Sequence, residues 1–250
     1  MKTLFLLSIT AILSFPTFAQ TCAKHLEKGL PSTQSDQILC RDGYAVGYNY
    51  STKNADWVAY HITADGVNVS IKRKNAFKAD QELPEYARST LADYRGSGYD
   101  RGHLAPSATM DFTRQSMLQS FLMSNMSPQL PGFNRNGWRI LEEHVRDLAN
   151  EYQELYVVTG PIYRGGESII GDGVIIPSAF YKVILDPNHD EAIAFIVPHQ
   201  KVTGAELESF IVTIDEVESQ TGLDFFSTTP DTIEDNMESL EWTQMWPTSH

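Results

Sequence analysis

The chain has 250 residues, 42% of them hydrophobic, which suffices for one substantial core, and no repeat, low-complexity tract or long flexible linker divides it. The formal net charge of −13 would disfavour a polyanionic partner if the charge were evenly distributed. From Asp186 to the C-terminus, however, 14 acidic residues stand against Lys201 alone, whereas 11 basic residues outnumber 8 acidic ones between Lys72 and Arg146. The composition therefore excludes a uniformly basic protein and remains compatible with a locally basic surface.

The N-terminus has the layout of a secretory signal peptide. Lys2 precedes an apolar run from Leu4 to Phe15, and a Thr-Phe-Ala sequence ending at Ala19 suits signal peptidase. A membrane anchor is the alternative, but the run is about a dozen residues long, below the roughly 20 that span a bilayer. We expect removal of residues 1–19, a single domain over 20–250, export to the periplasm or the medium, and no membrane association.

Two cysteines, Cys22 and Cys40, follow the predicted cleavage site. Because the chain is bound for an oxidising compartment, a Cys22–Cys40 disulfide is the natural expectation, and two free buried thiols are the alternative. Neither cysteine lies in a recognisable nucleophile context.

Hydrophobic periodicity predicts an α+β fold. Helical periodicity fits three segments, and β-branched and aromatic runs predict six strands. Because the two types are mixed without a regular βαβ rhythm, we expect a mainly antiparallel central sheet flanked by helices. The segment from Asp224 to Pro247 predicts an acidic, irregular tail, so that the compact part would end near residue 227. The predicted strands are Trp57–Thr63, Val67–Lys72, Leu155–Thr159, Val174–Ile176, Phe180–Leu185 and Ala192–Val197, and the predicted helices are Thr113–Met123, Trp138–Tyr152 and Gly204–Thr221.

The sharpest local signal is the run Tyr99-Asp100-Arg101-Gly102-His103. Histidine titrates near neutrality and can take a proton from water, while arginine can pair bidentately with a phosphate. The glycine allows close approach of the backbone to a ligand. This combination suits phosphodiester hydrolysis, although a surface Arg-Asp pair beside a structural histidine would look the same in isolation.

A second cluster comprises Ser124–Gln129 and Asn134, just ahead of the predicted helix that carries Glu142 and Arg146. Residues four apart share a helix face, so Glu142 and Arg146 can point together towards the turn that presents Asn134. A neutral amide oxygen is an acceptable ligand for Mg²⁺, which takes few protein ligands and keeps several waters. The alternative is that Asn134 caps the helix and Glu142–Arg146 is a solvated ion pair.

Together the two clusters resemble the DNA/RNA non-specific endonuclease family, the ββα-metal nucleases that include secreted sugar-nonspecific nucleases and mitochondrial endonuclease G. The family's Asp-Arg-Gly-His signature is matched at 100–103, with Leu-Ala-Pro following it. Its Asn-rich element is matched by 124–129, then by Asn134, Trp138 and Glu142 at the family's spacing. Weaker resemblance extends over nearly the whole mature chain and covers 77–80, 158–162, 177–182 and 221–226.

The resemblance implies a ββα-metal nuclease fold and an endonuclease that hydrolyses phosphodiester bonds of DNA and RNA, without sequence preference, to 5'-phosphate products. It implies that His103 is the general base and that Asn134 holds a single Mg²⁺, with Mn²⁺ as the alternative ion. Glu142 would orient metal-bound water.

The resemblance also implies roles for flanking residues. Asn125 would position His103 or the neighbouring helix turn, and Arg101 and Arg146 would offset charge on the phosphorane. Arg73 is our candidate for an upstream arginine that binds phosphate, and Asp100 is expected to be structural, holding the turn.

Two other functions stay open from sequence: a binding module that keeps the phosphate-binding surface without turnover, and a phosphodiesterase that acts on small nucleotides. The intact His103, Asn134 and Glu142 argue against the first. The strongly acidic C-terminal part departs from relatives that are often neutral or basic, which concerns substrate affinity and not the chemistry. We expect a monomer or a homodimer.

Overall fold

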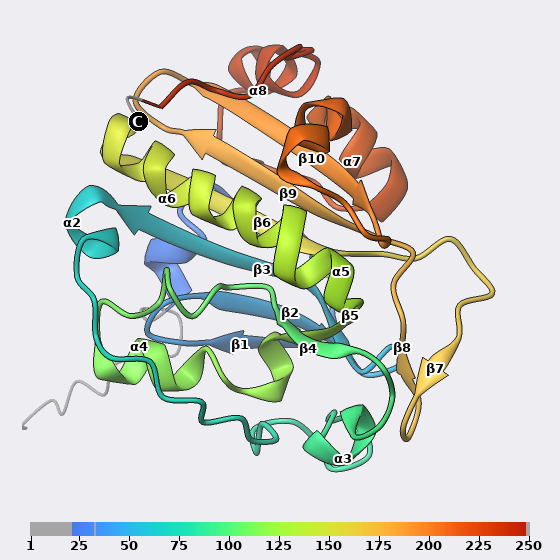
Figure 1. The fold of residues 1–250 in the computed structure, drawn as a ribbon. Helices are drawn as coiled ribbons and strands as arrows, with labels where there is room; N and C mark the ends of the chain where they lie inside the picture. The colour runs from blue at the N-terminus through green and yellow to red at the C-terminus, as the bar shows by residue number, and fades with distance from the viewer. Residues whose placement is uncertain (1–21, 33, 249–250) are drawn as a thin grey trace, which may run out of the picture.

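The computed structural model describes residues 22–32 and 34–248, and it is built around a seven-stranded sheet (Figure 1). The predicted signal peptide, residues 1–19, lies outside the described residues. The strand order is β1-β2-β3-β6-β9-β10-β11, and every neighbouring pair is antiparallel. The predicted α+β class with a mainly antiparallel sheet is therefore confirmed. Its strands are β1 (Gln37–Cys40), β2 (Ala45–Asn49), β3 (Asn54–Thr63), β6 (Glu154–Ile162), β9 (Ala179–Asp186), β10 (Glu191–Pro198) and β11 (Ile211–Val212).

The two faces of the sheet are covered by different helices. Successive side chains of β3 alternate between them, so that Val58 joins the core beneath α6 (Arg139–Tyr152) while Trp57 joins the opposite core. Helix α6 lies across one face, with Leu141 and Val145 buried against it, and α7 (Ile214–Thr221) packs on the other (Figure 1). This arrangement buries the apolar stripe that the sequence predicts for α6.

A small hairpin stands in front of α6. Strand β4 (Asp100–His103) pairs antiparallel with β5 (Met126–Gln129), and β5 leads through α5 (Pro131–Phe133) and the π-helical turn η3 (Asn134–Trp138) directly into α6. The order strand, strand, helix is the ββα unit that the resemblance implies. Both sequence clusters lie on it.

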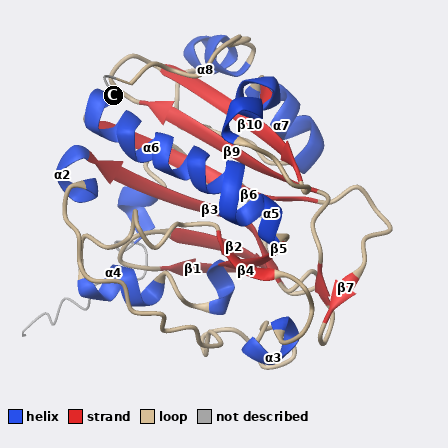
Figure 2. Ribbon diagram, viewed as in Figure 1, coloured by secondary structure: helices blue, strands red, loops and turns tan. Residues whose placement is uncertain are grey.

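The remaining elements are short, and the chain between α2 and β4 is mostly loop (Figure 2). A covalent link fixes the N-terminal part, because the predicted Cys22–Cys40 disulfide is present. The short elements are η1 (Ala23–His25), α2 (Ala64–Val67), α3 (Leu91–Tyr94), α4 (Arg114–Gln119), η2 (Met123–Asn125), β7 (Ile169–Ile170), β8 (Val174–Ile175), η4 (Gly204–Phe210) and α8 (Asp231–Glu238).

The sequence-based elements need three corrections, and β1 and β2 were not predicted. No strand covers Val67–Lys72: Thr63 caps α2 by accepting from the Gly66 amide, and Val69 is exposed. The helix predicted over Thr113–Met123 ends at Gln119. The helix predicted over Gly204–Thr221 is divided, because 211–212 pair with β10 and Thr213 then caps a new helix.

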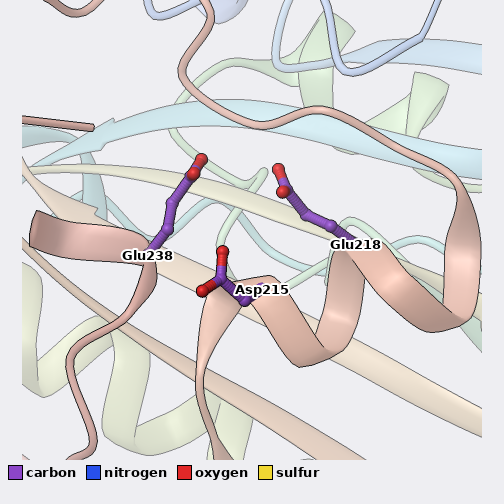
Figure 3. A group of neighbouring side chains, drawn as sticks. All are labelled: Asp215, Glu218 and Glu238. Atoms are coloured by element: carbon purple, nitrogen blue, oxygen red, sulfur yellow. The ribbon is translucent and has the colours of Figure 1, made fainter. Parts of the chain in front are cut away.

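The C-terminal segment is not the irregular tail that composition suggested. It contains α8, and the chain beyond it packs against the body, where Trp246 is buried and the Trp242 indole nitrogen donates to the Ala192 carbonyl at 2.8 Å. Between α7 and α8 the carboxylates of Asp215, Glu218 and Glu238 converge (Figure 3). The apolar anchors explain how so acidic a segment stays folded.

Candidate active site

The residues of both sequence clusters line one pocket of about 330 Å³ beside the ββα unit. It lies between the β4/β5 hairpin, the start of α6 and the loop that follows α2. All but one of the predicted site residues contribute to its wall. The lining residues are Arg73, Phe77, Arg101, His103, Pro106, Ser107, Ala108, Asn134, Arg135, Arg139, Glu142, Glu143 and Arg146.

His103 is the last residue of β4, and the hairpin fixes its backbone. Its strand partner is Met126, and Gly102 beside it pairs with Ser127. A Cβ at Gly102 would stand 2.0 Å from Oε1 of the buried Gln129, so this position has no room for a larger residue. The glycine of the signature therefore serves close packing within the hairpin.

The imidazole of His103 lies in an apolar and positively charged environment. The Phe121 ring packs edge-on at 5.0 Å between centroids, Phe77 lies at 5.8 Å, and Nε2 is shielded without a hydrogen-bond partner in the described part of the chain. Burial, followed by the charges of Arg73 and Arg101, lowers the pKa of His103 well below its ordinary value. The ring is thus neutral at neutral pH, the form that can accept a proton.

Two arginines are held beside this imidazole by aromatic rings. The guanidinium of Arg101 stands 4.2 Å from the Phe77 centroid, and that of Arg73 stands 5.2 Å from the Phe121 centroid. Both rings also contact His103. The structure therefore places Arg73 at the pocket, although it is 30 residues before His103 and the sequence could not fix its alignment.

Asn125 is the one predicted site residue that does not line the pocket. It is fully buried, its Nδ2 donates to the carbonyls of Ala105 and Ser120 at 2.9 Å each, and its Oδ1 accepts from the Ala105 amide at 2.8 Å. It thereby joins the turn after His103 to the end of α4. Its contacts are those of a positioning residue.

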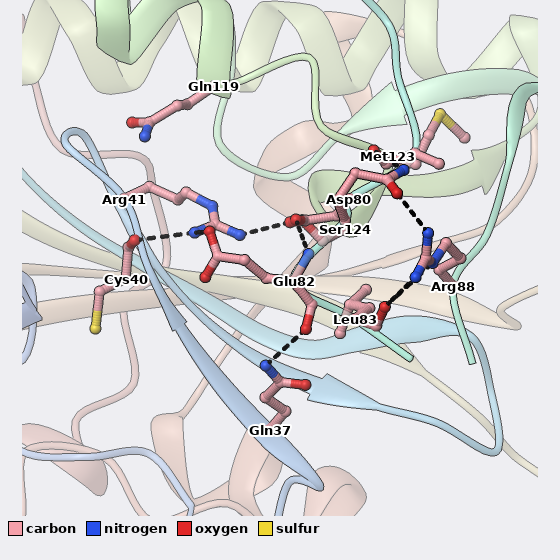
Figure 4. A network of polar contacts seen from close by, with 12 residues as sticks. Gln37, Cys40, Arg41, Asp80, Glu82, Leu83, Arg88, Gln119, Met123 and Ser124 are labelled. Carbon is pink, nitrogen blue, oxygen red and sulfur yellow. Dashed lines mark hydrogen bonds and ion pairs between the residues drawn. The ribbon is translucent and has the colours of Figure 1, made fainter. Parts of the chain in front are cut away.

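A buried ion pair supports the neighbouring backbone. Asp80 accepts from Arg41 and from the Ser124 hydroxyl at 2.6 Å each, as the dashed lines in Figure 4 show. Both Arg41 and Asp80 have side chains only 3% exposed. This network fixes η2, and with it Asn125, against the central sheet.

Asn134 lies where α5 passes into η3, just before the non-helical backbone of Asn136 (φ −120°, ψ −107°). Its Nδ2 donates to Asp100 at 2.9 Å, and the same carboxylate accepts from Arg135 at 2.8 and 2.6 Å. Partial burial favours the neutral acid, but the hydrogen bonds from Arg135 and Asn134 outweigh it and lower the pKa of Asp100. Asp100 thus links β4 to the start of the helix.

Glu142 and Arg146 stand one turn apart on α6, on the face that borders the pocket. Arg146 donates to the Glu142 carbonyl at 3.1 Å, and no carboxylate–guanidinium ion pair forms between them. Burial raises the pKa of Glu142, and the positive charges of Lys182 and Arg146 oppose that effect. The solvated ion pair that the sequence left open is therefore not what the structure contains.

The pocket also contains residues that sequence reasoning missed, above all Phe77, Arg135 and Arg139. Arg135 follows Asn134 directly, and Arg139 pairs with Glu143 one helical turn on, so both could have been found from helical spacing. Phe77 carried no local signal. The arginines outnumber the two glutamates, so the pocket is a basic site on an acidic protein.

A basic pocket on a hairpin-and-helix unit, with an unpaired imidazole facing a fixed amide, defines a ββα nuclease. The model of the DNA/RNA non-specific endonuclease family matches residues 22–232. The chain is 40% identical over 219 residues to nuclease C1 of Cunninghamella echinulata var. echinulata, covering 80% of this chain and 86% of that protein. It is 35% identical over 213 residues to human mitochondrial endonuclease G, covering 79% and 71%.

The solved structures agree with the sequence relatives. A chain of the EndoG/EndoGI complex superimposes with a TM-score of 0.78 and 31% identity, covering 84% of this chain and 92% of that one. The chain described here belongs to the DNA/RNA non-specific endonuclease family, and it is a nucleic-acid-hydrolysing enzyme.

Proposed function

We propose that this enzyme is a secreted, Mg²⁺-dependent endonuclease that hydrolyses DNA and RNA without sequence preference and leaves 5'-phosphate ends. The observation that carries the proposal is that His103 and Asn134, from opposite sides of the ββα unit, line one pocket with Arg101 and Arg146. The scissile phosphodiester is common to both polymers, so a site that contacts only phosphate would not distinguish the sugars.

His103 is the general base in this proposal. Its Nε2 has no hydrogen-bond partner in the described residues, and the lowered pKa keeps the ring neutral. A neutral imidazole can accept the proton of a water molecule as the water oxygen attacks phosphorus. Asn125 and Gly102 contribute indirectly, because they fix the backbone on either side of the ring.

The donor set of the pocket fits a hard cation. The amide of Asn134 is tied to Asp100 through nitrogen, so its oxygen is the group left for an ion, and Glu142 adds a carboxylate. Within residues 22–248 apart from residue 33, no cluster of three His, Cys, Asp or Glu ligands lies here, which suits an ion that keeps most of its waters. We therefore assign Mg²⁺, with Mn²⁺ as the alternative; when bound, it would stabilise charge on the leaving oxygen.

The arginines bind and neutralise the substrate phosphate. Arg101 and Arg146 flank the imidazole and Glu142, where they can offset charge that develops on phosphorus, and Arg73 can hold a phosphate oxygen from the opposite wall. Glu142 would face the hydration shell of the ion.

Secretion is proposed from the predicted signal peptide and is supported by the Cys22–Cys40 disulfide, which is stable in an oxidising compartment. Several relatives are mitochondrial nucleases, so location has to be measured for this chain. No helix among the described residues is long and apolar enough to cross a membrane. N-terminal sequencing of protein recovered from periplasm and medium should begin at residue 20, and a chain that begins at Met1 would contradict secretion. We expect a monomer or a homodimer.

The test of the mechanism is a paired measurement on His103→Ala. Cleavage of plasmid DNA and of RNA should fall together by about 10² to 10⁴. A gel shift should show retained binding that weakens with salt, because the arginines remain. His189→Ala, at an exposed histidine paired with Asp186, is the matched control and should cleave normally. Chelator should abolish cleavage by the parent and Mg²⁺ should restore it. Near-parental cleavage by His103→Ala would exclude it as the base, and hydrolysis of dinucleotides alone would favour a small-nucleotide phosphodiesterase.

A further inference from the structure

A lysine with no hydrogen-bond partner lies buried next to the pocket. Lys182, in β9, is 0% exposed, and its Nζ has no hydrogen-bond acceptor among the described residues. Its strand neighbours Phe180 and Ile184 belong to the core beneath α6, so the side chain points towards that helix. Burying an unpaired ammonium costs several kcal/mol, so the position calls for a compensating interaction.

The compensation comes from two aromatic faces and one carboxylate. Nζ stands 4.6 Å from the Trp138 ring centroid and 6.0 Å from that of Tyr60. The charge of Glu142 is the one interaction that raises the pKa of Lys182 against burial. In return, Lys182 is the strongest of the groups that favour ionised Glu142.

The other charged groups around Glu142 do not replace this lysine. Arg146 on α6 also favours the ionised form, but more weakly, and Glu143 on the same helix opposes it. Tyr60 on β3 is buried and neutral, with a pKa raised by burial. Across the pocket stand Arg73, Arg101, Arg135, Arg139, His103 and, through Asn134, Asp100.

We propose that Lys182 is a positioning residue of the active site, a buried cation behind α6 that keeps Glu142 ionised and ready to face the metal. This rests on the proposed function, in which Glu142 acts as a carboxylate. Lys182 does not line the pocket and touches neither substrate nor ion. It acts through the wall formed by Trp138 and Glu142.

The experiment measures Glu142 directly in the metal-free protein. The side-chain carboxyl carbon of Glu142, labelled with ¹³C and assigned by its loss in Glu142→Gln, is titrated in the parent, in Lys182→Met and in Lys182→Arg. Methionine keeps the length and removes the charge, so the titration of Glu142 should move upward by about one to three pH units. Arginine restores a charge and should move the titration back. An unchanged titration in Lys182→Met would overturn the proposal.

A merely structural lysine predicts a different pattern. Replacing a buried charge with an apolar side chain is often neutral or stabilising, so Lys182→Met should melt near the parent temperature while the acid limb of its kcat profile moves to higher pH. A lowered melting temperature with an unmoved titration and limb would mean that the lysine only packs. Should Lys182→Met fail to fold, Lys182→Gln is titrated in its place under the same criterion. Lys28→Met removes a cation 5.7 Å from the Tyr156 ring, away from the pocket, and should leave both readouts unchanged.

The outcomes also separate this proposal from the proposed function. Normal cleavage by His103→Ala would overturn the mechanism without affecting the Glu142 titration. An unmoved titration together with inactive His103→Ala would overturn the role of Lys182 alone.

Discussion

The carboxylate of Asp100 accepts a hydrogen bond from the side-chain nitrogen of Asn134 at 2.9 Å. Residues 34 positions apart, one on the hairpin and one at the head of the helix, are thereby joined at the pocket. Because the nitrogen is engaged, the amide oxygen of Asn134 is the atom left to meet an ion. The acid of the Asp-Arg-Gly-His run thus orients the proposed metal ligand, in addition to holding its turn.

Removal of this contact should weaken metal activation. In Asp100→Ala the Asn134 amide can rotate, so the Mg²⁺ concentration for half-maximal cleavage should rise by about 10- to 100-fold, with activity largely recovered at saturating Mg²⁺. Arg135→Ala removes the other partner of Asp100 and should change that concentration little. Asn134→Ala should lose activity that Mg²⁺ does not restore, with an unchanged circular dichroism spectrum. Equal Mg²⁺ dependence in Asp100→Ala and the parent would contradict the orienting role.

The pH dependence of cleavage should reflect the environment of His103. Because burial, Arg73 and Arg101 lower its pKa below 6.5, the base stays neutral to lower pH than a free imidazole would. The acid limb of kcat/KM should therefore lie below pH 6.5, and activity should be flat above it. Arg73→Gln removes one positive charge and should move the limb upward. A parental limb at or above pH 6.5 is incompatible with this account.

Gly102→Ala should damage the hairpin. The new methyl group would stand 2.0 Å from the Gln129 side chain, so the hairpin must distort, at a cost of about 1 to 3 kcal/mol in the free energy of unfolding. Cleavage should fall as well, because His103 follows directly. Adding Gln129→Ala removes the obstructing atoms and should recover part of both. Urea unfolding and initial rates measure the two effects, and a lack of recovery would place the clash elsewhere.

Glu238 should make the protein less stable as pH rises. Burial, and then the charges of Glu218, Glu234 and other nearby acids, raise its pKa from 4.5 to about 8. An acid with a raised folded-state pKa contributes stability that is complete below 4.5 and is lost as pH approaches 8. In chelator, Glu238→Gln should melt higher than the parent at pH 8 and lose less stability between pH 5 and 8. The exposed Glu241→Gln should behave as the parent; the same behaviour from Glu238→Gln would count against the raised pKa.

Loss of the disulfide should affect stability and not chemistry. Cys22 and Cys40 close a loop of 18 residues' separation, so the double alanine variant should lose about 3 kcal/mol in the free energy of unfolding. The bond joins η1 to β1, away from the pocket, so cleavage at 25 °C should be retained. Denaturant titration and initial rates report the two separately. A variant as stable as the parent would show that packing alone holds the N-terminus.

Much of the sheet could be predicted from sequence because its central strands are buried on both faces. Runs such as 155–159, 180–185 and 192–197 are rich in β-branched and aromatic residues, and all three lie within strands. The same composition failed at Val67–Lys72, because a strand also needs a partner and β3 is already paired on both sides by β2 and β6. The acidic composition after Asp224 likewise concealed the buried Met237 and Trp246.

What the sequence determined by itself is the set of groups whose relation is local. The four residues from Asp100 to His103 share one strand, and Glu142 and Arg146 share one helix face, because strand and helix geometry fix such spacings without reference to the rest of the chain. The presence of a base, an amide ligand and phosphate-binding arginines was therefore predictable.

Only the tertiary structure decided which distant groups act on these. Arg73 reaches the pocket from a loop with no regular structure, and Lys182 reaches Glu142 from a strand on the far side of a helix. Contacts of this kind depend on how the sheet, the hairpin and α6 pack together, and packing is not encoded in any short spacing. The charge on His103 and Glu142, which sets what each can do, follows from that packing because burial and distant cations determine it.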